Sequence, residues 1–241
     1  AGKEKLSESG GEEMSSSEIL EAVNRKKIRE YFIRFGERVA VDRASSICNP
    51  RLSDAYVYYL DQGIAGLTAL TDNGEEKGVL FFPQNRLLGF TPMLMRRFRG
   101  GKSGVPEPFG IDTKTDCVFY RMDERMFNRL MDEDQQFMAC VLEIVTCNYV
   151  DLVHKYHAVQ GDSAKKRFCS FLLEFSVEEK DKRRMPKVFS YVEIAKYLGI
   201  HPVTVSKIAA ELRDLGIIAK GRMGIEILDV EQLKELAAVE K

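Results

Sequence analysis

The segment YVEIAKYLGIHPVTVSKIAAELRDLGII, residues 191–218, is apolar at helical spacing but carries a glycine near its middle. An interior glycine costs a soluble helix roughly 1 kcal/mol relative to alanine, so one continuous helix is disfavoured. Glycine can take the left-handed conformation that ends a helix, and Pro202 suits the first turn of the next one. The apolar residues form two separate helical stripes, one of Ile194, Ala195 and Leu198 and the other of Val205, Ile208, Ala209 and Leu212. The segment therefore predicts two short helices joined by a tight turn at Gly199.

The residues around this turn are typical of a helix-turn-helix. Ala195 lies four residues before the glycine, where the two helices would cross and a small side chain is needed. Ile200 and Val205 are expected to fill the core between the helices. Further on, residues 217–227 predict two strands around a basic glycine turn, the wing of a winged helix, and Asp229 is expected to cap a last helix. A helical hairpin inside an enzyme is the alternative interpretation.

This arrangement predicts that the second helix enters the major groove of duplex DNA. We expect Val205 and Ile208 to point into the protein and Lys207 to point outward, where it can donate to guanine O6 and N7 or to a phosphate. Val203 would contact a thymine methyl group, and hydroxyl and basic groups would hold the DNA backbone. The predicted DNA-binding residues are Ser190, His201, Val203, Thr204, Ser206, Lys207, Lys220 and Arg222.

Length and composition suit a soluble protein of two domains, with 241 residues, 44% of them hydrophobic and 30% charged. The net charge of −1 gives no overall attraction to nucleic acid. Residues 162–224, however, hold 13 Lys and Arg against 8 Asp and Glu, and the predicted helix-turn-helix lies within them. No apolar run is long enough to span a bilayer and no signal peptide precedes the first domain, so we expect a cytoplasmic protein with no membrane partner.

The first half of the chain predicts an antiparallel β-barrel or jelly roll. Residues 1–17 are polar and are predicted to be a disordered arm, after which a helix is expected from Ser17, its cap, to about Tyr31. From Phe35 to about Met122, short β-prone segments alternate with turn residues such as Asn73-Gly74, and no helix is expected between them. The predicted strands are ERVAVD, AYVYYLD, GLTALTD, KGVLFF and DCVFYRM, with a Gly/Pro loop over residues 100–110.

A long helix is predicted from Asp123 to about His157, with apolar residues at intervals of three and four. Such a coiled-coil-like seam needs a partner, most simply the same helix of a second subunit. Packing on the chain's own barrel is the alternative, and both can hold because a helix has more than one face. The predicted dimerisation residues are Met138, Val141, Val145, Leu152 and Tyr156. An amphipathic helix over 162–177 and a charged connector over 177–187 follow.

The cysteines and histidines do not indicate a disulfide framework or a metal centre. The five Cys residues are odd in number and form no C-x-x-C pair. Cys140 and Cys147 lie seven residues apart on one helix face, where packing is the main interpretation and a redox role the alternative. His154 and His157 could share a face as metal or haem ligands, but solvated or interfacial positions are the simpler interpretation. No catalytic residue, metal or cofactor is predicted.

The order of barrel, long helix and winged helix resembles the Crp/Fnr family of bacterial transcription regulators. The resemblance covers residues 31 to about 240 and is carried by LDQGIAGL (60–67), NGEE (73–76), LLGF (87–90) and the stretch from Glu193-Ile194-Ala195 to Lys207. GIHPVTVSK is most similar to the branch of halophenol-sensing activators from organohalide-respiring anaerobes. The family often carries Arg or Glu where Pro202 and Val203 stand, and Arg where Lys207 stands, so its usual operator sequence is not expected here.

The resemblance implies a small effector, and the residues narrow its class. Cyclic-nucleotide members hold the phosphate with a Gly-Glu pair and an Arg-Ser/Thr pair, whereas here Phe90 follows Gly89 and residues 100–115 contain no Arg. Iron–sulfur members carry an N-terminal Cys cluster, but the first 47 residues hold no Cys. We therefore expect an apolar or aromatic effector between barrel and long helix. The predicted effector-binding residues are Phe81, Phe82, Gly89, Phe90, Asn148 and Tyr149, with Met93 and Met95 as further candidates and barrel core as the alternative role for all of them.

The predicted fold class is α+β, with a cyclic-nucleotide-binding-like jelly roll, a long dimerisation helix and a C-terminal winged helix-turn-helix. The expected domains are a disordered arm (1–17), a sensing barrel (18–122), a dimerisation helix (123–160) and a DNA-binding domain (161–241). The predicted function is a homodimeric transcription regulator that binds a palindromic operator under effector control, with RNA polymerase as a candidate partner. Two alternatives stay open: a ligand-independent regulator with a purely structural barrel, and a jelly-roll enzyme with an appended helical domain. The absence of His between residues 35 and 122 counts against a metal-dependent enzyme of this kind.

Overall fold

The computed structural model describes residues 16–48, 56–70, 76–98, 109–179, 182–221 and 224–238. The N-terminal half contains α1 (Ser16–Phe35), β1 (Glu37–Val41), β2 (Ser46–Cys48), β3 (Tyr56–Gln62), β4 (Ala65–Leu70), β5 (Glu76–Phe82), β6 (Arg86–Leu88), α2 (Phe90–Phe98), β7 (Phe109–Thr113) and β8 (Cys117–Asp123). The C-terminal half contains α3 (Glu124–Glu133), α4 (Gln135–Gly161), α5 (Ala164–Phe175), β9 (Val177–Glu179), β10 (Lys182–Arg184), α6 (Tyr191–Leu198), α7 (Pro202–Asp214), β11 (Ile218–Gly221), β12 (Gly224–Ile227) and α8 (Val230–Ala238).

The N-terminal strands form two antiparallel four-stranded sheets, with strand orders β1-β8-β3-β6 and β2-β7-β4-β5. One apolar core lies between them, because it takes Leu60 and Phe119 from the first sheet and Ala65 and Ile111 from the second. Two sheets that share a core in this way form a sandwich of the jelly-roll type. The predicted α+β fold class is confirmed.

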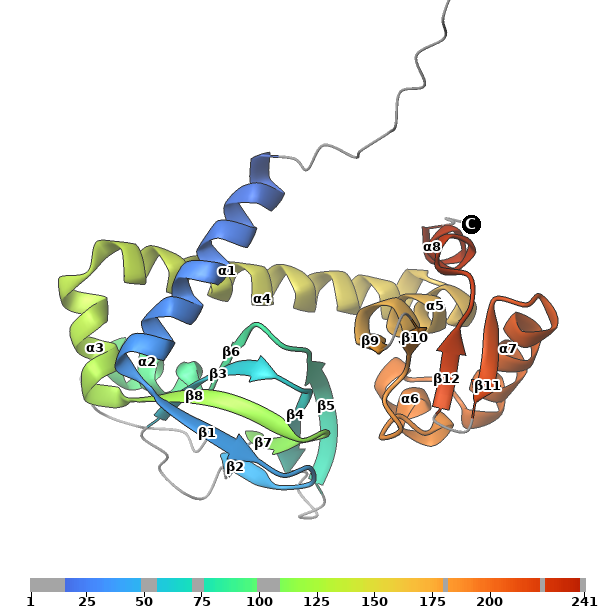
Figure 1. The fold of residues 1–241 in the computed structure, drawn as a ribbon, viewed down its shortest axis with the longest axis horizontal. Coiled ribbons are helices and arrows are strands. Elements are labelled where there is room, and N and C mark those ends of the chain that lie inside the picture. Colours follow the sequence, from blue (N-terminus) through green and yellow to red (C-terminus); the bar gives the residue numbers. More distant parts are fainter. Residues whose placement is uncertain are drawn as a thin grey trace, which may run out of the picture.

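Strand β3 is buried on both of its faces, which explains why its sequence YVYYL is apolar without alternation. Leu60 points into the core between the sheets, whereas Val57 and Tyr59 belong to a second core under the helices. That second core contains Phe32 of α1 and Phe137 of α4. Figure 1 shows α4 running along one side of the barrel towards the C-terminal unit, with α1 crossing it.

The single long helix predicted from Asp123 is wrong, because the chain forms two helices that break at Asp134. Asp134 is extended, with φ −121° and ψ 99°, and ends α3 before it starts α4. Its carboxylate accepts hydrogen bonds from the backbone N–H groups of Gln136 and Phe137, both at 3.0 Å. A carboxylate that satisfies free N–H groups is a strong helix start, and it fixes the break here.

Two further expectations for the N-terminal half are corrected. A helix, α2, lies between the barrel strands, where none was expected. Burial of Met93 on one face of FTPMLMRRF stabilises this helix against the rest of the protein. Helix α1 begins at Ser16 and reaches Phe35, so Ser17 lies inside the helix rather than at its cap. The predicted Asn73-Gly74 turn and most of the Gly/Pro loop lie outside the described residues; the strands that flank the turn, β4 and β5, pair antiparallel.

The C-terminal unit is a winged helix built on a four-stranded sheet of order β11-β12-β10-β9. The connector over 177–187, predicted only as charged, supplies β9 and β10, and β10 pairs with β12 through Arg183 and Arg184. Strands of three residues are too short to show an alternation of apolar and polar side chains, so the sequence pattern did not predict them. The last helix, Val230–Ala238, has the predicted position, and Asp229 Oδ1 accepts from Gln232 N at 2.9 Å as its cap.

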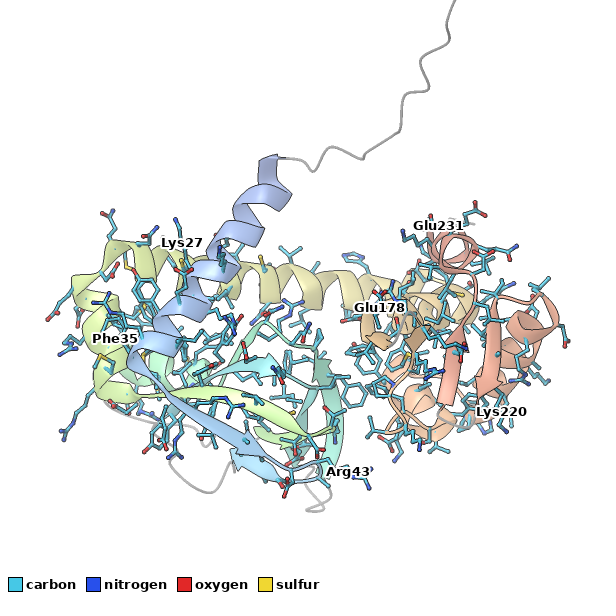
Figure 2. All side chains as sticks on the ribbon, viewed as in Figure 1. Lys27, Phe35, Arg43, Glu178, Lys220 and Glu231 are labelled. Carbon is cyan, nitrogen blue, oxygen red and sulfur yellow. The ribbon has the colours of Figure 1, made fainter. Side chains whose placement is uncertain are left out.

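Phe81 of β5 joins the barrel to the winged helix. Its ring stacks on Tyr197 of α6, with 4.9 Å between centroids and 11° between planes. It also meets Phe175 and Phe189 edge-on, at 6.0 and 5.2 Å. The side chain therefore belongs to the core of the C-terminal unit although its strand belongs to the barrel. Figure 2 shows side chains of both units reaching into the region between them.

None of the described helices is long and apolar enough to cross a membrane.

Candidate DNA interface and effector cavity

The turn between α6 and α7 has the geometry that the sequence predicted. Gly199 is left-handed, with φ 64° and ψ 39°, and ends α6. Ile200 N donates to Ala195 O at 3.0 Å, the bond that closes such a helix end. Ala195 and Val205 are buried, and Ile200 packs half-buried against the same core. The small residue and the two apolar plugs are therefore confirmed as the core of the helix-turn-helix.

His201 caps α7 with its ring. Nδ1 accepts from Val203 N at 3.2 Å, and Pro202 follows at the first helical position. This hydrogen bond requires Nδ1 to be unprotonated, so the proton lies on Nε2, which is left to donate to an external group. Ser190 caps α6 in the same manner, with its hydroxyl accepting from Glu193 N at 3.2 Å.

One face of α7 is buried and the opposite face is exposed. Val205, Ile208, Ala209 and Leu212 face the core, as predicted. Val203 is 53% exposed despite being apolar, and Ser206 and Lys207 are exposed beside it. Thr204 is half-buried. Helix α6 lies nearer the barrel than α7, which lies at the far side of the C-terminal unit (Figure 1).

The wing contributes one described cation to this region. Lys220 is exposed on β11 and is labelled at the edge of the C-terminal unit in Figure 2. Arg222 lies outside the described residues. Other basic residues of the same sheet, Lys182 and Arg184, form ion pairs with Glu226 at 2.7 and 3.1 Å. These pairs lower the pKa of Glu226, chiefly through the Lys182 hydrogen bond.

A cavity of about 810 Å³ lies between the barrel, α4 and the C-terminal unit. The barrel supplies Phe81, Phe82, Gly89 and Phe90 to its wall, and α4 supplies Asn148 and Tyr149. All six residues predicted to bind an effector thus border one cavity, while their binding role stays a prediction. Met93 is buried in the core under the helices and Met95 is largely exposed, and neither lines the cavity.

Sequence reasoning missed the contribution of the winged helix to this cavity. Arg167 and Phe171 of α5 and Tyr197 and Leu198 of α6 form part of the wall. These α5 and α6 residues are far from the barrel residues in the sequence, and they share a cavity wall because the contacts of Phe81 hold the two units together. The aromatic residues of α5 gave no signal of this contact, because Phe168, Phe171 and Phe175 are equally suited to the core of one domain.

Gly89, at the end of β6, is left-handed with φ 73°. A Cβ at this position would lie 3.1 Å from Tyr56 O and 3.3 Å from the Tyr58 ring. The glycine thus lets the chain turn into α2 against β3, and its backbone borders the cavity.

The predicted dimerisation residues divide between the two faces of α4. Met138, Leu152 and Tyr156 are exposed, as an interface with a second subunit requires. The prediction is wrong for Val141, which is 1% exposed and packs in the chain's own core with α1 and β3. Val145 is half-buried and lines the cavity. The cause is a one-residue phase error, since Leu142, not Val141, lies on the exposed face.

Cys117, Cys140, Cys147 and Cys169 form no disulfide within the described residues. Burial raises the pKa of Cys140 and Cys117, and raises that of Cys169 to about 11. A raised pKa keeps the thiol protonated and unreactive at neutral pH, which supports packing roles. Cys147 is half-buried. His157 is exposed beside Tyr156, and the side chain of His154 lies outside the described part of the chain.

Residues 166–236 match the family of the Crp-like helix-turn-helix domain. No curated protein matches the chain. Among solved structures, a transcriptional regulator of the CRP/FNR family from Thermus thermophilus superposes with a TM-score of 0.65 at 20% identity, covering 85% of this chain and 100% of that one. FixK2 from Bradyrhizobium japonicum superposes with a TM-score of 0.66 at 18% identity, covering 86% and 99%. CprK complexed with OCPA gives 0.57 at 17% identity, covering 87% and 93%.

The chain therefore has the fold of Crp/Fnr regulators, an antiparallel jelly roll followed by helices and a helix-turn-helix. Its C-terminal unit is a Crp-like helix-turn-helix domain.

Proposed function

We propose that this protein is a dimeric transcription regulator of the Crp/Fnr type that binds duplex DNA through α7 under the control of a small effector. The observation that carries the proposal is the exposed N-terminal face of α7, held by a helix-turn-helix with a buried core. An exposed Val203 beside Ser206 and Lys207 has no structural use inside the chain, but it suits a major groove.

The caps of α6 and α7 support contacts with DNA phosphates. The N-terminus of a helix presents free N–H groups and a partial positive charge, which attract an anion. Ser190 and His201 stand at these two ends and are both exposed. Lys220 on β11 would add a backbone contact, which fixes the position of the protein on DNA without reading bases.

An exposed apolar face on α4 supports a dimer. Its residues follow the alternating three- and four-residue spacing of a coiled-coil seam, in which each helix packs against its equivalent. They are Leu142, Val145, Tyr149, Leu152, Tyr156 and Val159, of which all but the half-buried Val145 are exposed. A closed two-fold dimer would cover this face and would match a palindromic operator.

The cavity supports control by an aromatic or apolar effector. Its volume of about 810 Å³ is within the range of small-molecule sites, and apolar side chains, both aliphatic and aromatic, dominate its wall. Tyr149 and Leu152 belong both to this wall and to the apolar face of α4. A bound effector would therefore touch the barrel, the dimer face and the winged helix at once.

The control mechanism follows from this geometry. Two recognition helices reach successive major grooves only when they are about 34 Å apart. An effector shifts the dimer towards that arrangement only if it binds it more tightly than the alternatives. We also expect the DNA-bound dimer to contact RNA polymerase, and we expect the protein to be related to the halophenol-sensing branch of the family.

The test is selection of bound duplexes from a random pool, followed by binding measurements with the Lys207→Ala variant. If Lys207 reads a base, the variant should lose about 1–3 kcal/mol of binding free energy and accept more sequences at one position. Lys234→Ala is the matched control, because Lys234 is an exposed lysine on α8. Equal loss in both variants, or no selected sequence at all, would reject α7 as the reading helix.

A further inference from the structure

Arg167 of α5 is the feature of the cavity wall that the proposed function leaves unexplained. Its Nη1 donates to Leu198 O at 2.6 Å, at the end of α6. Its Nε is buried and has no hydrogen-bond partner among the described residues. Arginine is a cation, so the wall of the cavity contains a charged group whose buried Nε donor has no partner within the described part of the protein.

Buried donors in folded proteins are almost always satisfied, and an exception indicates a missing partner. The Nε–Nη2 edge of an arginine fits the two oxygens of a carboxylate with parallel hydrogen bonds. Asp162 and Glu174 line the same cavity, but Asp162 pairs with Lys166 at 3.0 Å, and neither carboxylate accepts from the Arg167 Nε. The unpaired Nε therefore suits a carboxylate brought in by a ligand.

The rest of the wall defines the body of that ligand. Phe81 and Tyr197 stack face to face, Phe82, Phe90 and Tyr149 supply further rings, and aliphatic side chains such as Leu67, Leu87 and Leu152 supply the rest of the apolar wall. An apolar wall that offers several rings favours a flat apolar ring over a polar one, since aromatic rings attract one another stacked or edge-on.

Resting on the proposed function, we propose that the effector is an aromatic carboxylate and that Arg167 of the winged helix is the residue that binds its anionic group. In the complex, the guanidinium turns its Nε–Nη2 edge to the carboxylate and keeps the Nη1 bond to Leu198. The ring of the ligand contacts the barrel at Phe82 and Phe90. The ligand thus bridges the barrel and the helix-turn-helix directly.

The position of Leu198 gives this bridge a consequence for DNA binding. Leu198 is the last residue of α6 and precedes the turn at Gly199 that sets the direction of α7. Because one guanidinium holds both the ligand and this carbonyl, occupancy of the cavity restrains the turn. A ligand that restrains this contact shifts the population towards the arrangement of the DNA-binding units that it binds more tightly.

The test compares 2-naphthylacetate with its neutral isostere 2-naphthylacetamide by isothermal titration calorimetry on the full chain at pH 7. The wild-type protein should bind the acid at least about tenfold more tightly than the amide, as a charge-assisted bidentate pair implies. Arg167→Gln should remove this preference. It should weaken binding of the acid and leave the affinity for the amide within about twofold of the wild-type value. Arg167→Lys, which keeps the charge without the fork, should retain part of it.

Arg183→Gln is the matched control. Arg183 also donates to a backbone carbonyl of the same unit, Leu173 O at 3.1 Å, but it does not line the cavity. This variant should keep the wild-type preference for the acid. Circular dichroism and thermal unfolding of each variant show whether it is folded, and the lysine variant tests the proposal if the glutamine variant is not.

The outcomes separate this inference from the proposed function. If acid and amide bind equally well to the wild type, or if Arg167→Gln keeps the preference, the anion-binding role is overturned while effector control stands. If neither compound binds, effector control by an aromatic ligand fails and this inference fails with it.

Discussion

Gly199 shows at the scale of one residue how backbone conformation sets the course of the chain. Its φ of 64° lies in the left-handed region, and a Cβ there would meet no atom within 4 Å. The glycine is thus needed for its dihedral angle and not for space. Gly161 at the end of α4 is equally uncrowded, but it is helical and has no positive φ.

This pair gives opposite predictions for the same change. Gly199→Ala should lower the free energy of unfolding by about 1 kcal/mol, because alanine is strained in the left-handed region. Gly161→Ala should raise it by up to about 1 kcal/mol, because alanine favours the helix. Urea unfolding followed by circular dichroism measures both. A decrease of equal size in both variants would show that the dihedral angle is not the cause.

At the scale of one element, Asp134 decides where α4 begins. Besides capping α4, its carboxylate accepts from Tyr31 Oη at 2.7 Å, which ties α1 to the break between α3 and α4. The hydrogen bond from Tyr31 is the main cause of the lowered pKa of Asp134. Burial, followed by the bond to Asp134, raises the pKa of Tyr31 to about 12.

The lowered pKa predicts a pH-dependent contribution of Asp134 to stability. Since the folded pKa lies below the ordinary aspartate value of about 3.9, the stabilisation is fully present above that value and is lost as the pH falls through the folded pKa. In urea unfolding from pH 7 down to pH 3, the gap in midpoint between wild type and Asp134→Asn should therefore be largest at neutral pH and should close in acid.

Glu133→Gln is the control for this experiment. Glu133 is the exposed neighbour of Asp134 and no cap or tyrosine bond depends on it. Its variant should unfold at the wild-type midpoint at pH 7. A constant gap between wild type and Asp134→Asn at all pH values would contradict the cap's charge as the origin of the effect.

At the scale of the whole molecule, two contacts matter. The Phe81 junction joins the barrel to the winged helix, and the exposed face of α4 is the surface through which two chains are proposed to pair. Phe81 places the barrel against the winged helix, and the cavity exists because of that contact. The apolar face of α4 is open in the single chain, with Tyr149 67% exposed. Exposed apolar area of this kind is typical of an interaction surface, which supports the proposed dimer.

Two leucines of equal exposure test the dimer. Leu142 on α4 and Leu228 after the wing are each 56% exposed. Leu142→Glu should give a monomer, because it places like charges opposite one another in the seam, and operator affinity should fall at least about tenfold. Leu228→Glu should leave the sedimenting mass equal to that of the wild-type dimer. Sedimentation of both variants and the wild type measures this, and a dimer that survives Leu142→Glu would refute the α4 interface.

The helix-turn-helix could be read from the sequence because its determinants are local. Gly199, Pro202 and the apolar stripes act within one or two turns of chain, so their spacing fixed both helices and their buried faces. The barrel strands were recognisable for the same reason where they were long. Short strands such as β6 and β9 were missed, since three residues have no measurable period and form only because a neighbour pairs with them.

The sequence by itself thus determined the two helices of the helix-turn-helix, the longer barrel strands and the inward face of α7, because each depends on contacts close along the chain. Tertiary structure decided which face of α4 is free, since Val141 and Leu142 are equally apolar and only packing against α1 and β3 distinguishes them. It also decided that Arg167 borders the cavity. That position depends on Phe81 meeting Tyr197, a contact between residues more than a hundred apart whose free energy no local pattern records.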